Sequence, residues 1–147
     1  MTAFRKTTLW AGLLVLAATC AGAEGVHHKL AVHVDENDPA VMNMALNNVA
    51  NVIGYYEAQG DTVSIEVVTY GPGLTMLLAD GSPVADRISA MALAHDGLTF
   101  AACGNTLAAM EQKAGTTIAL MPEATLVPSG VVQLISLQED GYAYVRP

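Results

Sequence analysis

The chain has 147 residues, of which 52% are hydrophobic and 14% charged, and its formal net charge is −8. This length allows one domain rather than two, and the apolar share excludes an intrinsically disordered chain. So acidic a protein repels phosphate backbones and anionic lipid heads, which disfavours nucleic acids and membrane surfaces as partners.

Residues 1–23 have the pattern of a cleavable signal peptide. Two basic residues precede an uncharged run over 9–20, which is too short for a stable membrane span, and small residues at the end fit a cut before Glu24. We therefore expect a periplasmic or secreted protein. The alternative is a lipoprotein anchored at Cys20, but Thr19 is large for the residue before a lipidated cysteine.

Cleavage would leave a single cysteine in the mature chain. It would also remove two basic residues and no acidic one, so that the net charge becomes −10. An exported domain with one cysteine forms no internal disulfide. Three fates stay open for Cys103: a buried inert side chain, a disulfide between chains, or a free thiol kept for chemistry.

Apolar, β-branched segments alternate with helical segments along the rest of the chain. Asp38 and Pro39 predict the start of the first helix, through a side-chain cap and a residue that needs no N–H partner. The strands are predicted at 29–34, 63–69, 98–102, 124–127 and 142–145, and the helices at 39–58, 74–78, 83–93, 106–113 and 130–139.

This alternation is typical of the α/β class. Several of the strands are apolar without strict alternation, as in parallel sheets that are covered on both faces. We therefore predict a single three-layer α/β/α domain over residues 24–147, with a mainly parallel sheet of about five strands. Ligands of such open sheets lie beyond the carboxyl ends of the strands.

Cys103 is the main candidate for chemistry because it lies where the third strand ends and a helix begins. We expect Asn105 to cap that helix. Backbone N–H groups and the positive end of the helix dipole favour thiolate over thiol at such a position, and a thiolate is a nucleophile. The alternative is a cysteine that only fills space, since free cysteine is among the most buried residue types.

Two further loops are expected at the same edge of the sheet. The turn Gly71-Pro72-Gly73 brings backbone amides near an anion, but it lacks the lysine and the length of a P-loop, so a structural turn is the simpler interpretation. Ser129 is placed to cap the helix 130–139, and no base stands beside it in the sequence.

The polar residues elsewhere predict no metal site. The histidines lack the spacing of a helical zinc site, and no second cysteine joins them. Three asparagines lie four residues apart and form one helical stripe, which is a solvent face, a subunit interface or a set of groups directed at a pocket. These residues are His27, His28, His33 and His95, and Asn43, Asn47 and Asn51.

Four segments resemble the DsrE/DsrF family of sulfur-relay proteins, in particular its small YchN-like branch. Their order and spacing extend the resemblance over nearly all of the mature chain. The segments are VVTYGPG at 67–73, FAACGNTL at 100–107, VPSGVV at 127–132 and LQEDGYAY at 137–144. Within them, Cys103 stands in the C-x-N-T-L motif typical of this branch.

The resemblance implies a small DsrEFH-like α/β domain that assembles as homotrimers or homohexamers. It also implies that Cys103 carries sulfane sulfur as a persulfide and hands it to a partner, with no cofactor. An anionic persulfide or a small sulfur-containing ligand is then expected to meet the pocket candidates Gly71, Gly73, Gly104, Asn105, Thr106 and Ser129.

The export signal departs from the best understood members of this family, which are cytoplasmic. Many members of the branch have no established activity, and fold analogy does not certify function. The alternative hypothesis is a non-catalytic oligomeric module that binds a small ligand, or an accessory subunit, in which Cys103 is merely structural. The sequence leaves open whether the chain is an enzyme; at most it implies a sulfur-carrier or transferase-like role.

Overall fold

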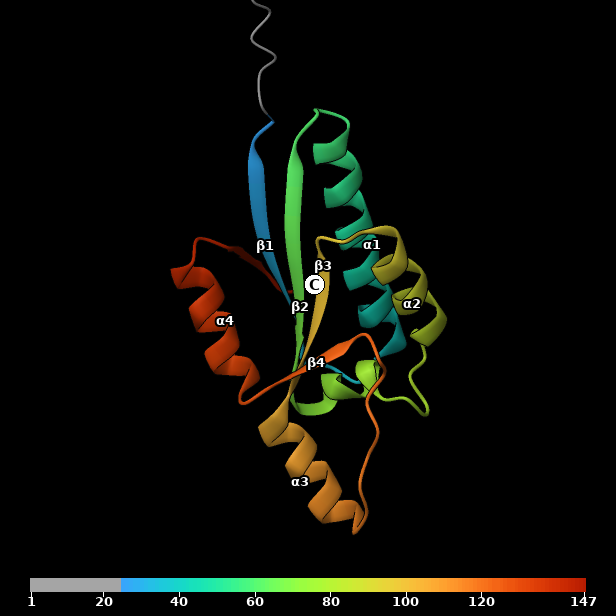
Figure 1. Cartoon of the computed structure of the whole chain (residues 1–147). Coiled ribbons are helices and arrows are strands. Elements are labelled where there is room, and N and C mark those ends of the chain that lie inside the picture. The colour runs from blue at the N-terminus through green and yellow to red at the C-terminus, as the bar shows by residue number, and fades with distance from the viewer. Residues whose placement is uncertain (1–24) are drawn as a thin grey trace, which may run out of the picture.

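The computed structural model describes residues 25–147, and the predicted signal peptide lies outside the described residues (Figure 1). One sheet has the strand order β4-β3-β2-β1-β5, and all its neighbouring strands are parallel. The predicted α/β class with a parallel sheet is thereby confirmed. The strands are β1 (His27–Val34), β2 (Thr62–Thr69), β3 (Leu98–Cys103), β4 (Ala124–Val127) and β5 (Ala143–Val145). The helices are α1 (Pro39–Glu57), the 3₁₀ helix η1 (Gly71–Leu77), α2 (Ala85–Ala94), α3 (Gly104–Ala114) and α4 (Gly130–Glu139).

The direction of the crossovers places the helices on the two faces of the sheet. From β1 to β4 each connection moves one strand along the sheet in the same direction, so right-handed crossovers put α1 and α2 on one face. After β4 the chain returns across the sheet to β5, so α4 covers the other face (Figure 1). In contrast, α3 extends beyond the carboxyl ends of the strands (Figure 1).

Two apolar cores of unequal size lie against the sheet. The larger core packs β-strand side chains such as Val32 and Phe100 against α1, α2 and η1. The smaller core, under α4, contains Ala31, Val68, Ala101, Leu134 and Leu137. Because side chains alternate along a strand, the side chains that follow Ala31 and Ala101 two positions later, His33 and Cys103, also face α4.

The predicted start of the first helix is confirmed at its cap. Asp38 Oδ1 accepts a hydrogen bond from the Ala40 N–H at 2.8 Å, and Pro39 is the first helical residue. The asparagine stripe has a role within the chain, because Arg87 of α2 donates to the side chains of Asn43 and Asn47. These two asparagines therefore join α1 to α2.

Several element boundaries differ from the prediction by one or two residues, and the largest difference concerns the segment between β2 and β3. The helix expected from residue 83 begins at Ala85, and the glycine turn and the helical turn after it form one 3₁₀ helix. Gly73 permits this arrangement, since a Cβ there would lie 2.3 Å from the carbonyl oxygen of Val34. Among the described residues, no helix combines the length and the apolar character needed to cross a bilayer.

Candidate functional site at the carboxyl edge of the sheet

Cys103 is the last residue of β3 and the cap residue of α3. The chain leaves β3 toward α3, whereas it leaves β4 toward α4 on the opposite face of the sheet. Loops that diverge in this way open a crevice between neighbouring strands, and open α/β sheets place their sites there. The residue is only 4% exposed, so it is less open to solvent than its position at the edge predicts.

Hydrogen-bond donors from two helices surround the sulfur of Cys103. They are the hydroxyl of Thr106 and the backbone N–H groups of Gly130, Thr106 and Asn105. Burial raises the pKa of the Cys103 thiol, but these donors together outweigh burial and hold the pKa below its ordinary value of 9.0. The structure therefore favours the thiolate.

Thr106 joins the thiol to the glycine turn. Its Oγ1 accepts a hydrogen bond from the Gly71 N–H at 2.9 Å, while its hydroxyl donates to the sulfur of Cys103. The N–H of Gly73 donates to the carbonyl oxygen of Tyr70 at 3.2 Å. Both glycine N–H groups thus have partners within the chain, and the donors that reach the sulfur belong to α3 and α4.

The predicted Asn105 cap is wrong. Helix α3 begins at Gly104 with Cys103 as its cap residue, and the Asn105 side chain is exposed. The backbone N–H of Asn105 donates to the carbonyl oxygen of Pro128 at 3.2 Å and also approaches the sulfur. Since the thiol and this carbonyl satisfy the first turn, the helix needs no side-chain cap.

Gly130 brings β2, β3 and α4 together at the site. A Cβ at this position would lie 3.0 Å from the Cβ and Cδ1 of Tyr70 and 3.3 Å from the Cβ of Cys103. Ser129 occupies the predicted cap position of α4 but makes no side-chain cap bond. The missing side chain of Gly130, rather than the hydroxyl of Ser129, is therefore what lets α4 reach the sulfur. Gly104 is also closely packed, because a Cβ there would lie 3.0 Å from the carbonyl oxygen of Val127 in β4.

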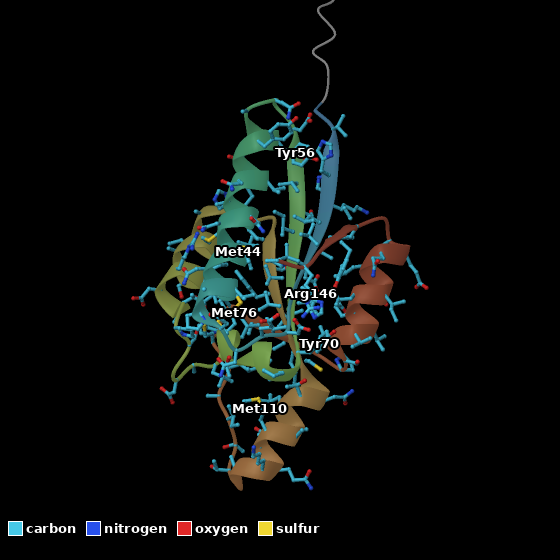
Figure 2. The ribbon with its side chains drawn as sticks, turned by 180° about the vertical axis from the view of Figure 1, so that it is seen from behind. Met44, Tyr56, Tyr70, Met76, Met110 and Arg146 are labelled. Carbon is cyan, nitrogen blue, oxygen red and sulfur yellow. The ribbon has the colours of Figure 1, made fainter. Side chains whose placement is uncertain are left out.

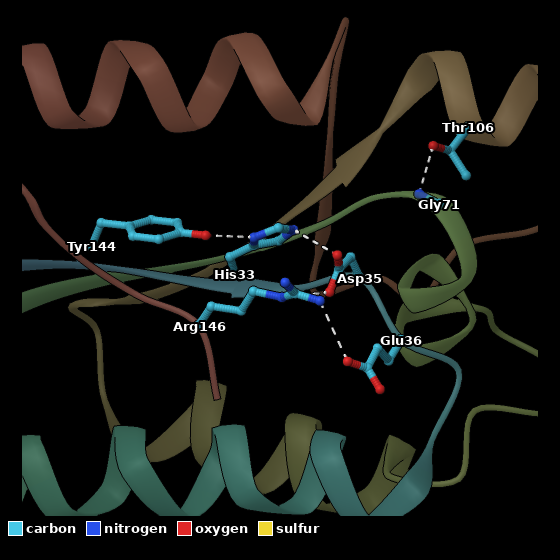
Figure 3. Close-up of polar contacts among 7 residues, drawn as sticks. All are labelled: His33, Asp35, Glu36, Gly71, Thr106, Tyr144 and Arg146. Carbon is cyan, nitrogen blue, oxygen red and sulfur yellow. Dashed lines mark hydrogen bonds and ion pairs between the residues drawn. The ribbon is translucent and has the colours of Figure 1, made fainter.

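A second polar cluster lies at the ends of β1 and β5, on the same edge of the sheet as the thiol (Figure 3). The His33 ring stacks on Tyr70 with centroids 4.5 Å apart, and its Nδ1 lies 2.8 Å from the hydroxyl of Tyr144. Its Nε2 is buried without a hydrogen-bond partner, 3.9 Å from an oxygen of Asp35. Burial lowers the pKa of His33, the Asp35 carboxylate opposes this effect, and the charge of Arg146 adds to it.

Arg146 closes this cluster on its exposed side. Its guanidinium pairs with Asp35 at 3.0 Å and with Glu36 at 3.4 Å (Figure 3). Tyr70 links the cluster to the thiol, because it stacks on His33 and also contributes to the close packing around Gly130. Burial raises the pKa of Tyr70, and the nearby Asp35 charge raises it further, so the phenol is neutral.

The site residues that the sequence did not predict lie in this second cluster. His33, Tyr144 and Arg146 meet only because β5 pairs with β1, with Ala31 beside Tyr144 in the register. No local pattern shows that pairing. Tyr70 and Gly130 belong to the two loops that were expected at this edge, so position along the strands was the available signal for them.

No cluster of metal ligands accompanies the thiol. Within residues 25–147, no three His, Cys, Asp or Glu side chains are arranged to hold a metal ion. Two histidines at the other end of the sheet instead have partners in the chain: His28 Nε2 lies 3.1 Å from Asp61, and His95 Nδ1 lies 3.7 Å from Glu57.

A parallel sheet with a hydrogen-bonded thiol at its carboxyl edge defines a small α/β domain with a cysteine site. The DsrE/DsrF-like family profile matches residues 28–147, and the chain belongs to this family. The predicted resemblance is thereby confirmed. A solved structure of MTH1491, a protein of unknown function from Methanobacterium thermoautotrophicum, is similar, with 31% identity and a TM-score of 0.69. The match covers 82% of this chain and 99% of that chain. No curated protein matched the chain.

Proposed function

We propose that this protein carries sulfane sulfur as a persulfide on Cys103. The observation that supports the proposal is the set of donors from Thr106, Asn105 and Gly130 around one sulfur, which lowers its pKa. The same donors suit a persulfide anion, which is also a buried negative charge on sulfur.

Loading requires no cofactor. The Cys103 thiolate attacks the terminal sulfur of a donor R–S–SH, so that a new S–S bond forms to Sγ while the donor S–S bond breaks. The donor leaves as the thiolate RS⁻, and Cys103 becomes S–SH. Transfer to an acceptor thiolate is the same exchange in reverse. The sulfane sulfur is passed on without an external oxidant or reductant.

Intact-mass measurement tests this proposal. Folded protein treated with inorganic polysulfide and freed of excess reagent should gain about 32 Da, one sulfur atom. A thiol reductant should remove the added mass. The Cys103→Ser variant should gain nothing while keeping the circular dichroism spectrum of the fold.

A second function is favoured by one observation, the 4% exposure of Cys103. A thiol that iodoacetamide reaches only after unfolding, together with no gain of mass from polysulfide, would contradict the carrier function. Cys103 would then be structural, and the chain would be an oligomeric small-ligand-binding or accessory module.

We also propose that the protein acts in the periplasm after removal of residues 1–23. The support is the basic start, the uncharged run and the small residues before Glu24. N-terminal sequencing of protein from the periplasmic fraction should begin at Glu24. Protein that keeps Met1 and stays in the cytoplasm would contradict the proposal.

We propose further that the protein assembles as a homotrimer or homohexamer. It is supported by the apolar side chains that α4 exposes, namely Val131, Val132 and Ile135, and by Leu126 on β4. Exposed apolar surface of this kind is typical of a contact between subunits.

A further inference from the structure

A groove of about 510 Å³ lies between η1 and α3, next to the cysteine site. Gly71 and Pro72 line it from η1, and Thr106, Ala109, Met110 and Lys113 line it from α3. Figure 2 shows Met110 on the part of α3 that approaches η1. The wall is mostly apolar and contains no acidic side chain.

One end of this groove is positively charged. Lys113 forms no ion pair or hydrogen bond within residues 25–147, whereas the three other basic side chains of that range are all engaged. Lys29 donates to a backbone carbonyl, Arg87 binds α1, and Arg146 pairs with carboxylates. An unengaged cation in so acidic a chain attracts an anionic group to this end of the groove.

The other end of the groove lies at Thr106, next to the buried thiol of Cys103. Thr106 lines the groove, and its hydroxyl donates to the sulfur of Cys103. Thr106 and Lys113 are seven residues apart on α3, which at the rise of a helix corresponds to about 10 Å. A bound molecule therefore meets Thr106, whose hydroxyl contacts the buried thiol, at one end, an apolar wall along its length, and a cation at the other end.

We infer that this groove binds the organic part of the sulfur donor: a small thiol persulfide with an apolar body and a carboxylate about 10 Å from its sulfur. The carboxylate pairs with Lys113, and the sulfur lies at the Thr106 end. The inference rests on the function proposed for Cys103, since a sulfur donor is expected in this groove only if Cys103 accepts sulfur. In the transfer, the bound donor loses its terminal sulfur to Sγ and leaves as the thiolate.

The test uses a donor mimic that cannot transfer sulfur, ω-(methylthio)octanoate, and its uncharged counterpart, ω-(methylthio)octanol. Isothermal titration calorimetry at low salt should show the carboxylate binding up to about fivefold tighter than the alcohol, the upper end of the range for one exposed ion pair. Lys113→Gln should abolish this difference. The matched control Lys29→Gln removes the same charge near the start of β1, away from the groove. This variant should keep the difference in affinity between the carboxylate and the alcohol. The bound carboxylate should also slow alkylation of Cys103 by iodoacetamide.

Three results would overturn the inference. In the first, the carboxylate and the alcohol bind with equal affinity. In the second, Lys113→Gln and Lys29→Gln lose the same affinity for the carboxylate. In the third, the protein binds neither compound and Lys113→Gln changes its oligomeric mass. The last result would assign the groove to a contact between copies of the chain. Failure of the proposed function would give a different result. The carboxylate would still bind in the groove and slow alkylation of Cys103, but polysulfide would add no mass to Cys103.

Discussion

At the scale of single residues, the thiolate of Cys103 depends on hydrogen-bond donors rather than on a neighbouring cation. No lysine, arginine or histidine in the described part of the chain is among the causes that lower its pKa. The donors at the starts of α3 and α4 suit so acidic a protein, because interactions with a buried atom are screened by salt much less than interactions between surface charges are.

Removing the Thr106 hydroxyl should raise the pKa of Cys103. Thr106→Val has nearly the same shape but donates nothing to the sulfur, so less thiolate is present at neutral pH. Alkylation by iodoacetamide at pH 7 should slow by about tenfold, the value of one hydrogen bond to a charged group. The conservative variant Thr106→Ser keeps the hydroxyl and should keep the rate. Equal rates in the valine variant and the natural protein would show that the backbone donors suffice.

His33 should make the fold less stable in mild acid. Its folded pKa is lowered from 6.5, so below pH 6.5 the unfolded chain binds a proton that the folded chain does not. The free energy of unfolding therefore falls as the pH decreases from 6.5 toward the folded pKa, and this contribution is fully present above 6.5. In urea unfolding compared at about pH 7.5 and pH 5.5, His33→Phe should lose part of this pH dependence. An unchanged pH dependence in His33→Phe would mean that the buried ring is not the group that titrates.

At the scale of elements, the start of α4 is positioned by the absence of a side chain at Gly130. Gly130→Ala should destabilise the fold by about 1–3 kcal/mol, because the added carbon overpacks Tyr70 and Cys103. The matched control is Gly54→Ala in α1, where a Cβ meets nothing within 4 Å. That change should stabilise the helix by about 0.5–1 kcal/mol. Similar effects of the two substitutions on urea unfolding would contradict the packing argument.

Local patterns predict the elements of this fold better than they predict its site. The strand cores and the Asp38–Pro39 helix start follow from residue types alone, and so does the place of Cys103 at the end of β3. The first turn of α3 could not be predicted, because its cap depends on the carbonyl oxygen of Pro128 from a neighbouring loop. The His33 cluster could not be predicted either, since it depends on which edge of the sheet β5 joins.

At the scale of the whole molecule, the exposed face of α4 should hold the proposed oligomer together. Val132→Glu places a charge on a side chain that is 59% exposed in the single chain. If subunits meet there, light scattering should show dissociation toward the monomer, because the buried charge would lack a partner. The control Leu93→Glu changes a side chain on α2 that is 89% exposed, and it should leave the mass unchanged. Dissociation by Leu93→Glu alone would place the contact on the opposite face.

The tight fit around Gly130 leaves little room for an additional sulfur atom beside Cys103. Since even one carbon at Gly130 would come within 3.0 Å of Tyr70, loading should push the phenol ring or the first turn of α4 out of place. The described chain contains five tyrosines and no tryptophan, so near-ultraviolet circular dichroism should follow that movement directly. An acceptor that touches Tyr70 would then sense whether the carrier is full before any sulfur is exchanged.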